Sequence, residues 1–364
     1  MALRAGVVLS ASVLAAVGLL AIASADRTPS QLASRQALWL VIGIGLAALA
    51  ARERAWLLSR SLAVHAGACA LVALTLLSSL AHHGAHRWLA LGPITLAPVP
   101  FATLTLVLAL ARVLAPARPP GDDGARTPRA ALSWLALLSA LALPAMFQPD
   151  RTGVLVAVLA SLVLVYAVPM RHEGRAVIET CIAIGLVAFA LTLPAHHQAR
   201  WDAFVRHDDP QGAGWWTERM GELVADGGLF GRGRGALLEH HARIGGAIDH
   251  GTLGVVAYEG GLVAILATLG ASLVLVLCLL ALARRADEPR DALMVIGVAM
   301  LFAIPSLLHA GAVLGLLPPL AVAMPLVSYG GSAVVALLVG LGLALSSPTR
   351  DPATEDRRNG SVAS

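Results

Sequence analysis

Apolar residues occur in ten long runs separated by polar segments. About 20 apolar residues in an α-helix cross the hydrocarbon core of a bilayer, and the runs reach or approach that length. The runs lie at about 6–24, 37–51, 62–80, 99–115, 131–147, 153–169, 176–194, 252–281, 292–316 and 331–346. This pattern predicts an all-α integral membrane protein with about ten transmembrane helices, of which the eighth is long enough to tilt or to begin outside the bilayer.

Composition excludes a soluble globular protein. Of 364 residues, 57% are hydrophobic and 13% are charged, and the mean hydropathy is +0.77. Such a balance could not keep a folded domain in aqueous solution. The three cysteines lie inside apolar runs without paired spacing, and we interpret them as small buried hydrophobic residues. Residues 1–346 are expected to form one polytopic membrane domain.

The distribution of arginine predicts the orientation of the chain. All 26 basic residues are arginine. If the N-terminus is cytoplasmic, 16 of them lie in inner segments, 4 in short outer loops and 6 in the long segment 195–251. Short loops rich in arginine stay in the cytoplasm, so both termini are predicted inside and 195–251 outside, between helices 7 and 8. Segments 116–129 and 347–364, rich in Pro, Gly and charge, predict a cytoplasmic linker and a disordered tail.

The first run allows a second interpretation. It follows Arg4 and ends in Ala-Ser-Ala before Asp26, a pattern that also fits a cleaved signal peptide. Because its apolar stretch is long for a signal peptide, we favour a transmembrane helix. Cleavage would leave nine spans with the same orientation downstream.

A polar segment of 57 residues between two spans, 195–251, indicates a functional role. Its Trp pair, Trp215 and Trp216, fits interfacial anchoring as well as substrate binding. Two acidic residues, Asp249 and Glu259, lie where the chain re-enters the membrane. We therefore expect chemistry on the outer face of the membrane.

The outer segment also contains a glycine-rich stretch, residues 227–235. Its glycines permit a tight turn, and Arg232 and Arg234 suit an anionic headgroup or pyrophosphate, although the motif alone fits a flexible solvated loop at least as well. A dinucleotide fingerprint or an RNA-binding box is not expected, because there is no βαβ context and the segment lies outside the cell. No nucleic-acid partner is predicted.

Histidine clusters provide no metal-site pattern. His82, His83, His86, His240 and His241 have no carboxylate or cysteine at ligand spacing, so we interpret them as solvated loop histidines. No metal ligands are predicted.

The last outer loop, residues 315–332, interrupts the helical pattern with three prolines and a glycine pair. Irregular backbone at membrane depth is tolerated only where protein or a water-filled cavity satisfies its polar groups. This loop is therefore expected to line a site.

Five short stretches follow one another along the chain in a recognisable order. They are Gly84-Ala85-His86-Arg87-Trp88-Leu89, Gln148-Pro149-Asp150 with Gly153, Asp208-Asp209-Pro210-Gln211-Gly212-Ala213-Gly214, Gly228-Leu229-Phe230-Gly231-Arg232-Gly233, and Gly315-Leu316-Leu317-Pro318 through Ser328-Tyr329-Gly330-Gly331-Ser332. Together they resemble motifs of the SEDS family, the FtsW, RodA and SpoVE proteins of bacterial cell-wall synthesis, and the last stretch is the most specific.

The resemblance implies a glycosyltransferase of the bacterial cytoplasmic membrane that polymerises lipid II, usually with a class B penicillin-binding transpeptidase, for cell division or cell shape. A sugar hydroxyl attacks an anomeric carbon and expels undecaprenyl pyrophosphate, which needs a base and positive charge. Membrane lipids are expected to surround the chain. Whether a divalent cation assists the pyrophosphate is left open by the sequence, and no organic cofactor is expected.

The same resemblance gives the candidate site residues. Asp249 is the expected base, His250 the alternative and Glu259 a supporting acid. The candidate substrate-binding residues are Arg87, Trp88, Arg232, Arg234, Arg243, Ser328, Tyr329, Gly330, Gly331 and Ser332.

The chain departs from the family pattern at several positions. A count without gaps from Ala257-Tyr258-Glu259-Gly260-Gly261 places His250 in the slot of the family's essential Asp, whereas a slip of one residue restores Asp249. The family's acid and base in Pro-Ser-Glu-Phe-Ala-Lys correspond to Pro100 and Thr103, so both are absent. His309 stands for an Asn and Ala333 for a Ser.

These departures leave two alternatives to an active polymerase. The first is a catalytically weak or silent relative that binds lipid II or a transpeptidase and regulates wall synthesis. The second is a flippase for lipid-linked sugars, which would want more polar residues inside the bundle than Glu179, Glu259, His65 and His309.

Overall fold

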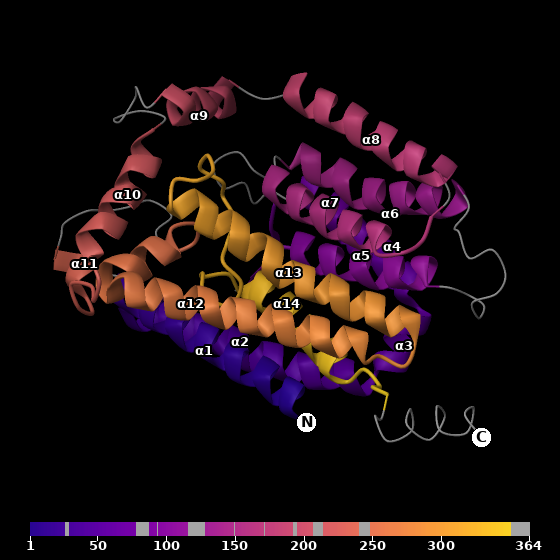
Figure 1. Cartoon of the computed structure of the whole chain (residues 1–364), viewed down its shortest axis with the longest axis horizontal. Helices are drawn as coiled ribbons and strands as arrows, with labels where there is room; N and C mark the ends of the chain where they lie inside the picture. The colour runs from indigo at the N-terminus through magenta and orange to yellow at the C-terminus, as the bar shows by residue number, and fades with distance from the viewer. Residues whose placement is uncertain are drawn as a thin grey trace, which may run out of the picture.

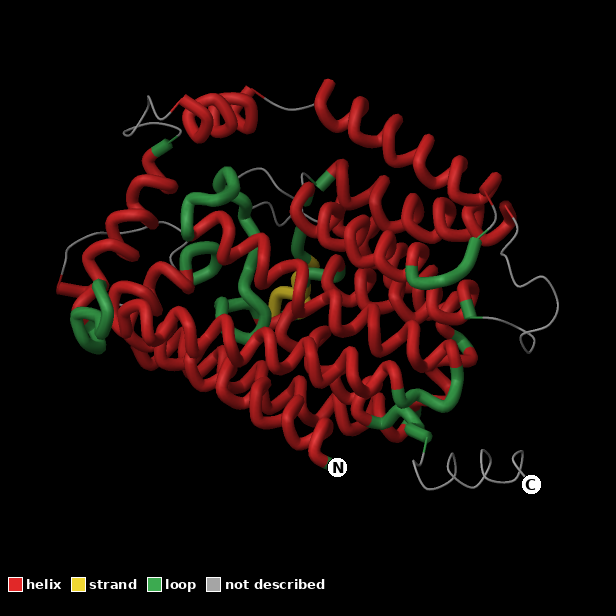
Figure 2. The backbone as a smooth tube through the Cα atoms, in the orientation of Figure 1, coloured by secondary structure: helices red, strands yellow, loops and turns green. Residues whose placement is uncertain are grey.

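The structure is a computed structural model of the chain. It describes residues 1–25, 29–77, 87–92, 94–115, 128–148, 150–170, 172–191, 195–206, 214–239 and 248–350. Helices dominate it, and loops gather mainly at the two ends of a helical bundle (Figures 1 and 2).

Within the described residues, each apolar run predicted from the sequence falls mainly in a helix. The helices are α1 (Ala2–Ala25), α2 (Pro29–Arg52), α4 (Ser61–Leu74), α5 (Val99–Leu114), α6 (Pro128–Phe147), α7 (Arg151–Tyr166), α8 (His172–Leu191), α12 (Thr252–Arg284), α13 (Pro289–Val313) and α14 (Gly331–Leu345). Among the described residues, α1, α2, α6, α12 and α13 are long and apolar enough to cross a membrane, and α4, α5, α7 and α14 are shorter apolar helices. The predicted class, a multi-pass helical membrane protein, is confirmed, while the number of spans stays a prediction.

Helix α5 forms the centre of the bundle. It packs against α4, α6, α7, α13 and α14 (Figure 1). Every residue from 102 to 111 is buried, because the stretch is apolar except for Thr103 and Thr105 and has helices packed around it. The outer end of α5 is thereby held at a fixed place among the helices around it.

Three described segments predicted to face the cytoplasm, the N-terminus, the turn between α12 and α13 and the residues after α14, meet at one end of the bundle. The Arg4 guanidinium donates to the Ser347 carbonyl (2.8 Å), and the Arg350 amide donates to the Arg285 carbonyl (2.7 Å). At the opposite end, the Tyr329 amide donates to the Ile248 carbonyl (2.9 Å). The chain is thus grouped as the arginine pattern requires, and the assignment of one end to the cytoplasm rests on that pattern.

Small elements connect the long helices. They are α3 (Arg54–Ser59), η1 (Thr75–Leu77), β1 (Leu89–Leu91) and β2 (Ile94–Leu96), the last two forming an antiparallel hairpin that pairs Leu89 with Leu96. The sequence pattern predicts only a loop there, since each strand is three residues long. The hairpin leads directly into α5.

The long outer segment is more ordered than a polar loop. It contains α9 (Ala195–Arg206), α10 (Trp215–Gly227) and α11 (Ala236–Glu239), and α10 packs against α12 near one end of the bundle (Figure 1). Met220 and Leu223, three residues apart on α10, are fully covered, and the Met220 sulfur lies against Gly254. This short apolar stripe explains why a mostly polar segment folds onto the bundle.

Helix α12 is broken at Gly261, where φ is +67°. The glycine loop, residues 227–235, docks against the break: the Leu262 amide donates to the Gly228 carbonyl (2.9 Å), and the Arg232 amide donates to the Tyr258 carbonyl (2.8 Å). A Cβ atom on Gly261 would lie 2.4 Å from the Leu229 carbonyl oxygen. The glycines therefore let two backbones touch, and residues 252–260 form a short helix apart from the long one that follows.

We expect Gly261→Ala to lower the free energy of unfolding by about 2 kcal/mol or more, because the new methyl group clashes with the glycine loop at a left-handed backbone position. Gly270→Ala is the matched control on the same helix, where a Cβ atom meets nothing within 4 Å. Thermal unfolding in detergent would compare the two variants. Equal unfolding temperatures for both would contradict the docking of the glycine loop.

Candidate functional site

A cavity of about 270 Å³ lies where α5, α7, α13 and α14 meet the irregular segment 321–330. Its polar lining comes from His250, Thr103, Asp150, Thr152 and Ser328. The rest of the wall is backbone and apolar side chains, from Val99, Pro100, Gly153, Val156, Leu301, Pro305, Ala321, Val322, Ala323, Met324, Pro325, Leu326, Gly330, Ala333, Val334, Ala336 and Leu337. Segments far apart in the sequence thus converge on one small volume.

His250 is the predicted catalytic residue that faces this cavity. Asp249, the adjacent residue, is partly buried but is not among the described residues that line the cavity. Burial raises the pKa of the Asp249 carboxyl above its ordinary value, and the positive charge of His250 acts in the opposite direction. The two candidates therefore differ in placement. His250, which the count without gaps puts in the slot of the family's Asp, is the one that lines the cavity.

The turn that contains Asp249 and His250 is held on both sides by the last outer loop. Before it, the Ile248 carbonyl accepts from the Tyr329 amide (2.9 Å). After it, the hydroxyls of Thr252 and Ser328 lie 2.9 Å apart. Since the Thr252 hydroxyl donates to the Ile248 carbonyl (2.7 Å), the Ser328 hydroxyl donates to Thr252. The loop thereby brackets the two catalytic candidates.

The other predicted residues of the last outer loop hold the bundle together. The Ser332 hydroxyl accepts from the Ala97 amide (2.9 Å), which ties α14 to the segment between β2 and α5. Gly331 touches Trp39, since a Cβ atom there would lie 2.4 Å from the indole nitrogen. Gly330 lines the cavity. In the structure this motif positions backbone, and its role in binding substrate stays a prediction.

Arg87 lies close to the Asp150 side of the cavity. Its Nε donates to the Gln148 carbonyl (3.3 Å), and the Gln148 amide nitrogen donates to the Val72 carbonyl (2.6 Å). Asp150 follows two residues later and caps α7, its carboxylate accepting from the Gly153 amide (3.0 Å). Trp88, the neighbour of Arg87, is half-buried. A cationic group is thus held beside the turn that forms one wall.

Arg232, Arg234 and Glu259 belong to a different neighbourhood. Both arginines are exposed on the glycine loop, and the Arg232 Nε donates to the Asp226 carbonyl (2.7 Å). The Glu259 carboxylate accepts from the Gly235 amide (3.0 Å), so it helps to fasten the glycine loop to α12. None of the three lines the cavity in the described part of the chain. Arg243, the remaining candidate, lies outside the described residues.

The positions that depart from the family pattern cluster around the same cavity. Pro100, Thr103, His250 and Ala333 all line it. His309 stands directly behind the wall: its Nδ1 donates to the Val322 carbonyl (2.8 Å) and its Nε2 accepts from the Leu253 amide (3.3 Å). Changes scattered over more than 200 positions of sequence therefore fall at one place in the fold.

Two residues of the site do not emerge from the sequence analysis. Gln36 is buried and contacts the last outer loop, yet it lies one residue before the apolar run predicted at 37–51. Thr252 is a single hydroxyl at the start of a long apolar run. The available signal was a polar side chain at the edge of a membrane helix, which is uncommon unless it has a partner.

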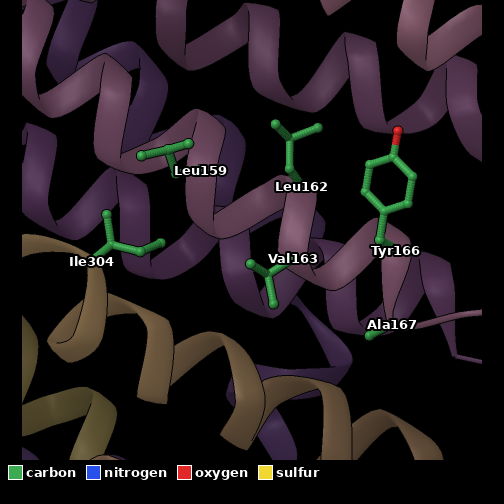
Figure 3. Close-up of a pocket in the computed structure, with 6 residues that line it drawn as sticks. All are labelled: Leu159, Leu162, Val163, Tyr166, Ala167 and Ile304. Atoms are coloured by element: carbon green, nitrogen blue, oxygen red, sulfur yellow. The ribbon is translucent and has the colours of Figure 1, made fainter. Parts of the chain in front are cut away.

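An apolar groove lies on α7 and α13. It has a volume of about 570 Å³, and Figure 3 shows its lining side chains, which are Leu159, Leu162, Val163, Tyr166, Ala167 and Ile304. Leu159, Leu162, Val163 and Tyr166 come from the second half of α7, Ala167 follows its end, and Ile304 comes from α13. The groove offers a surface for a hydrocarbon chain between two membrane helices.

Metal ligands do not cluster in the described part of the chain. No group of three or more His, Cys, Asp and Glu side chains there is placed to hold a metal ion. The idea of a divalent cation at a pyrophosphate therefore rests on substrate chemistry alone.

Comparisons with known proteins agree over nearly the whole chain. The profile of the FtsW/RodA/SpoVE family, described as cell cycle protein, matches residues 2–350. A probable peptidoglycan glycosyltransferase FtsW of Enterococcus hirae is 26% identical over 93% of this chain and 90% of its own length. The peptidoglycan glycosyltransferase MrdB of Escherichia coli K12 is 30% identical over 73% of this chain and 71% of its own length.

Solved structures give the same result. The rod shape determining protein RodA of Thermus thermophilus is similar with a TM-score of 0.67 and 27% identity, over 94% of this chain and 95% of that one. A chain from a peptidoglycan synthase complex, solved for the structural coordination of polymerization and crosslinking, is similar with a TM-score of 0.75 and 28% identity, over 93% and 96%. The match covers both the bundle and the segments that build the cavity.

We expect Thr252→Val and Ser328→Ala to be energetically coupled, because each removes one partner of the same buried hydrogen bond. The free energy of unfolding should show a coupling of about 1 kcal/mol in a double-mutant cycle. Thr268→Val is the control, since that hydroxyl donates only to the Ala264 carbonyl (2.7 Å) within α12. Additive effects of Thr252→Val and Ser328→Ala would argue against the hydrogen bond between these two hydroxyls.

Proposed function

The chain belongs to the FtsW/RodA/SpoVE family, and on that premise we propose that it is a peptidoglycan glycosyltransferase, which polymerises lipid II on the outer face of the bacterial cytoplasmic membrane for division or cell shape. The observation that supports this most is the position of His250. It lies in a cavity whose walls are built by the last outer loop and by the turn at Asp150.

The proposed reaction joins two lipid-linked sugars. A sugar hydroxyl on one molecule attacks the anomeric carbon of another, the new glycosidic bond forms, and undecaprenyl pyrophosphate leaves with the electrons of the broken bond. A base must take the hydroxyl proton as the bond forms. A neutral imidazole is suited to that task near neutral pH, so His250 is the base in this proposal, with Asp249 at the adjacent position.

The leaving pyrophosphate needs positive charge. Arg87 is the candidate for this role, because its guanidinium is held at the Gln148 carbonyl, two residues before Asp150 of the cavity wall. A guanidinium can donate two parallel hydrogen bonds to phosphate oxygens, which suits a developing charge on the leaving group. Arg232 and Arg234 would act farther out, where the glycine loop can meet headgroups or the approaching strand.

The apolar groove between α7 and α13 would hold the undecaprenyl chain. A long isoprenoid must lie in an apolar surface while its pyrophosphate is at the reaction centre. The groove shares α7 with the cavity, since Asp150 and Thr152 stand at the start of this helix and Leu162 and Tyr166 near its end.

A class B penicillin-binding transpeptidase is the proposed partner. The similar chain from a peptidoglycan synthase complex was solved in the context of polymerization and crosslinking together. Polymerisation should therefore be assayed with lipid II, with and without the cognate transpeptidase, and the products separated by size. If no polymer forms under either condition, a regulator that binds lipid II or a transpeptidase would explain the fold instead.

We expect His250→Gln to lower kcat for polymerisation by about 100-fold or more, because general-base catalysis contributes about 10²–10⁴-fold. The rate of the unchanged protein should fall as pH decreases, because a protonated imidazole cannot take the hydroxyl proton. Asp249→Asn should lower kcat less and keep this acid limb. A profile of kcat against pH would measure both.

The opposite result would identify Asp249 as the base. Its pKa is raised by burial, so its acid limb would lie above the ordinary carboxyl range, and activity would be lost as pH falls through that raised value. The limb would then disappear in Asp249→Asn and persist in His250→Gln. Polymer formed at full rate by both variants would remove the site assignment altogether.

We expect Leu162→Trp, which fills the groove, to raise the KM for lipid II about tenfold and to leave the KM for a short-chain analogue nearly unchanged, since the loss of one well-fitted apolar contact costs about 1–2 kcal/mol. Leu273→Trp is the control, because Leu273 is exposed on α12 away from the groove. Steady-state kinetics with the two substrates would decide. An equal rise in KM for both substrates would show that the groove does not bind the undecaprenyl chain.

A further inference from the structure

Gln36 is a buried amide on α2 that contacts the last outer loop twice. Its Nε2 donates to the Ser328 carbonyl (3.2 Å), and its Oε1 accepts from the Gly330 amide (3.2 Å). The side chain is 1% exposed. Both ends of one amide are therefore used on a stretch of three residues.

The two backbone groups that Gln36 satisfies have few other possible partners. Gly330 is the N-cap of α14 and carries no side chain that could cap the helix. Ser328 is buried in irregular backbone between α13 and α14. A buried backbone group without a partner costs free energy comparable to a lost hydrogen bond, so a side chain from another helix replaces the missing secondary structure.

Residues 328–330 also hold the turn that contains Asp249 and His250. Tyr329, between the two residues that Gln36 holds, donates its amide to the Ile248 carbonyl, and the Ser328 hydroxyl contacts Thr252. His250 lies between Ile248 and Thr252. A continuous chain of hydrogen bonds therefore runs from α2 through the last outer loop to the residues on either side of His250.

Helix α2 is well placed to act as an anchor, because it packs closely on α14. A Cβ atom on Gly342 would lie 2.4 Å from the Ala47 carbonyl oxygen, and one on Gly43 would lie 2.5 Å from a Leu338 methyl carbon. Trp39, one turn after Gln36, contacts Gly331. These contacts fix the position of Gln36 relative to the start of α14.

We propose that Gln36 is a positioning residue of the cavity: its amide sets the backbone of residues 328–330, which in turn holds His250 in the cavity wall. It does not touch the reacting atoms. The structural part stands on the contacts above, whereas the effect on rate rests on the proposed polymerase activity.

The test compares Gln36→Met, which keeps the volume of the side chain and removes both hydrogen bonds, with Gln31→Met, an exposed glutamine on the same helix. Hydrogen exchange of the backbone amides of the whole protein is measured by mass spectrometry, together with thermal unfolding in detergent. We expect Gln36→Met to speed exchange about tenfold in the peptides that cover 248–252 and 328–331 while α5 and α13 stay protected. Gln31→Met should change nothing.

Kinetics add a second measurement, kcat per folded molecule, which does not change when part of the protein is unfolded. We expect Gln36→Met to lower kcat about 10- to 100-fold per folded molecule with less than a threefold change in the KM for lipid II, since misplacing a catalytic group by a fraction of an ångström is costly. At low pH, Gln36→Glu should approach the kcat of the unchanged protein measured at the same pH, because the protonated carboxyl reproduces both hydrogen bonds, and it should fall below that kcat as pH rises.

Two results would overturn the proposal. One is unchanged exchange at 248–252 in Gln36→Met, which would show that the chain of hydrogen bonds does not reach the site. The other is a kcat per folded molecule equal to that of Gln31→Met in a protein that polymerises lipid II. If the unchanged protein makes no polymer, the proposed function fails, and the exchange measurement still decides whether Gln36 positions the turn.

Discussion

The irregular backbone between α13 and α14 must have its polar groups satisfied inside an apolar bundle, and the architecture of the site follows from that need. Water is scarce at such a position, so the protein itself supplies the partners. They come from Gln36 on α2, from the Ile248 carbonyl shortly before α12 and from His309 on α13. The same bonds that make the irregular segment tolerable also determine where His250 lies.

The sequence predicted the helices well because membrane helices have a strong signal. A run of apolar residues long enough to cross a bilayer has few alternatives, so the ten long apolar helices of the bundle follow the runs closely within the described residues. The kink at Gly261 was not predicted, because its cause is the distant glycine loop and not the local sequence. The helices of the outer segment were missed for a similar reason, since α10 is mostly polar and is ordered by two apolar contacts.

The candidate site was predicted in its members more than in its geometry. Motif spacing pointed to His250 and Asp249 as neighbours in sequence, but only the fold separates the residue that faces the cavity from the one beside it. Glu259 and Arg232 appeared equivalent to the other polar residues of the outer face, whereas the structure places them at the glycine loop. Pro100, Thr103 and Ala333 are departures from the family pattern in the sequence, and the structure shows that they share one cavity with His250.

The complete burial of α5 has a consequence for how the chain is made. In the finished fold residues 102–111 contact protein on every side, so lipid places no demand on them. During synthesis, however, α5 leaves the ribosome before α7, α13 and α14 exist, and it must partition into the bilayer as a helix without those neighbours. Its largely apolar surface thus meets the requirements of insertion first and those of packing later, which explains why only Thr103 and Thr105 interrupt the apolar residues from 102 to 111.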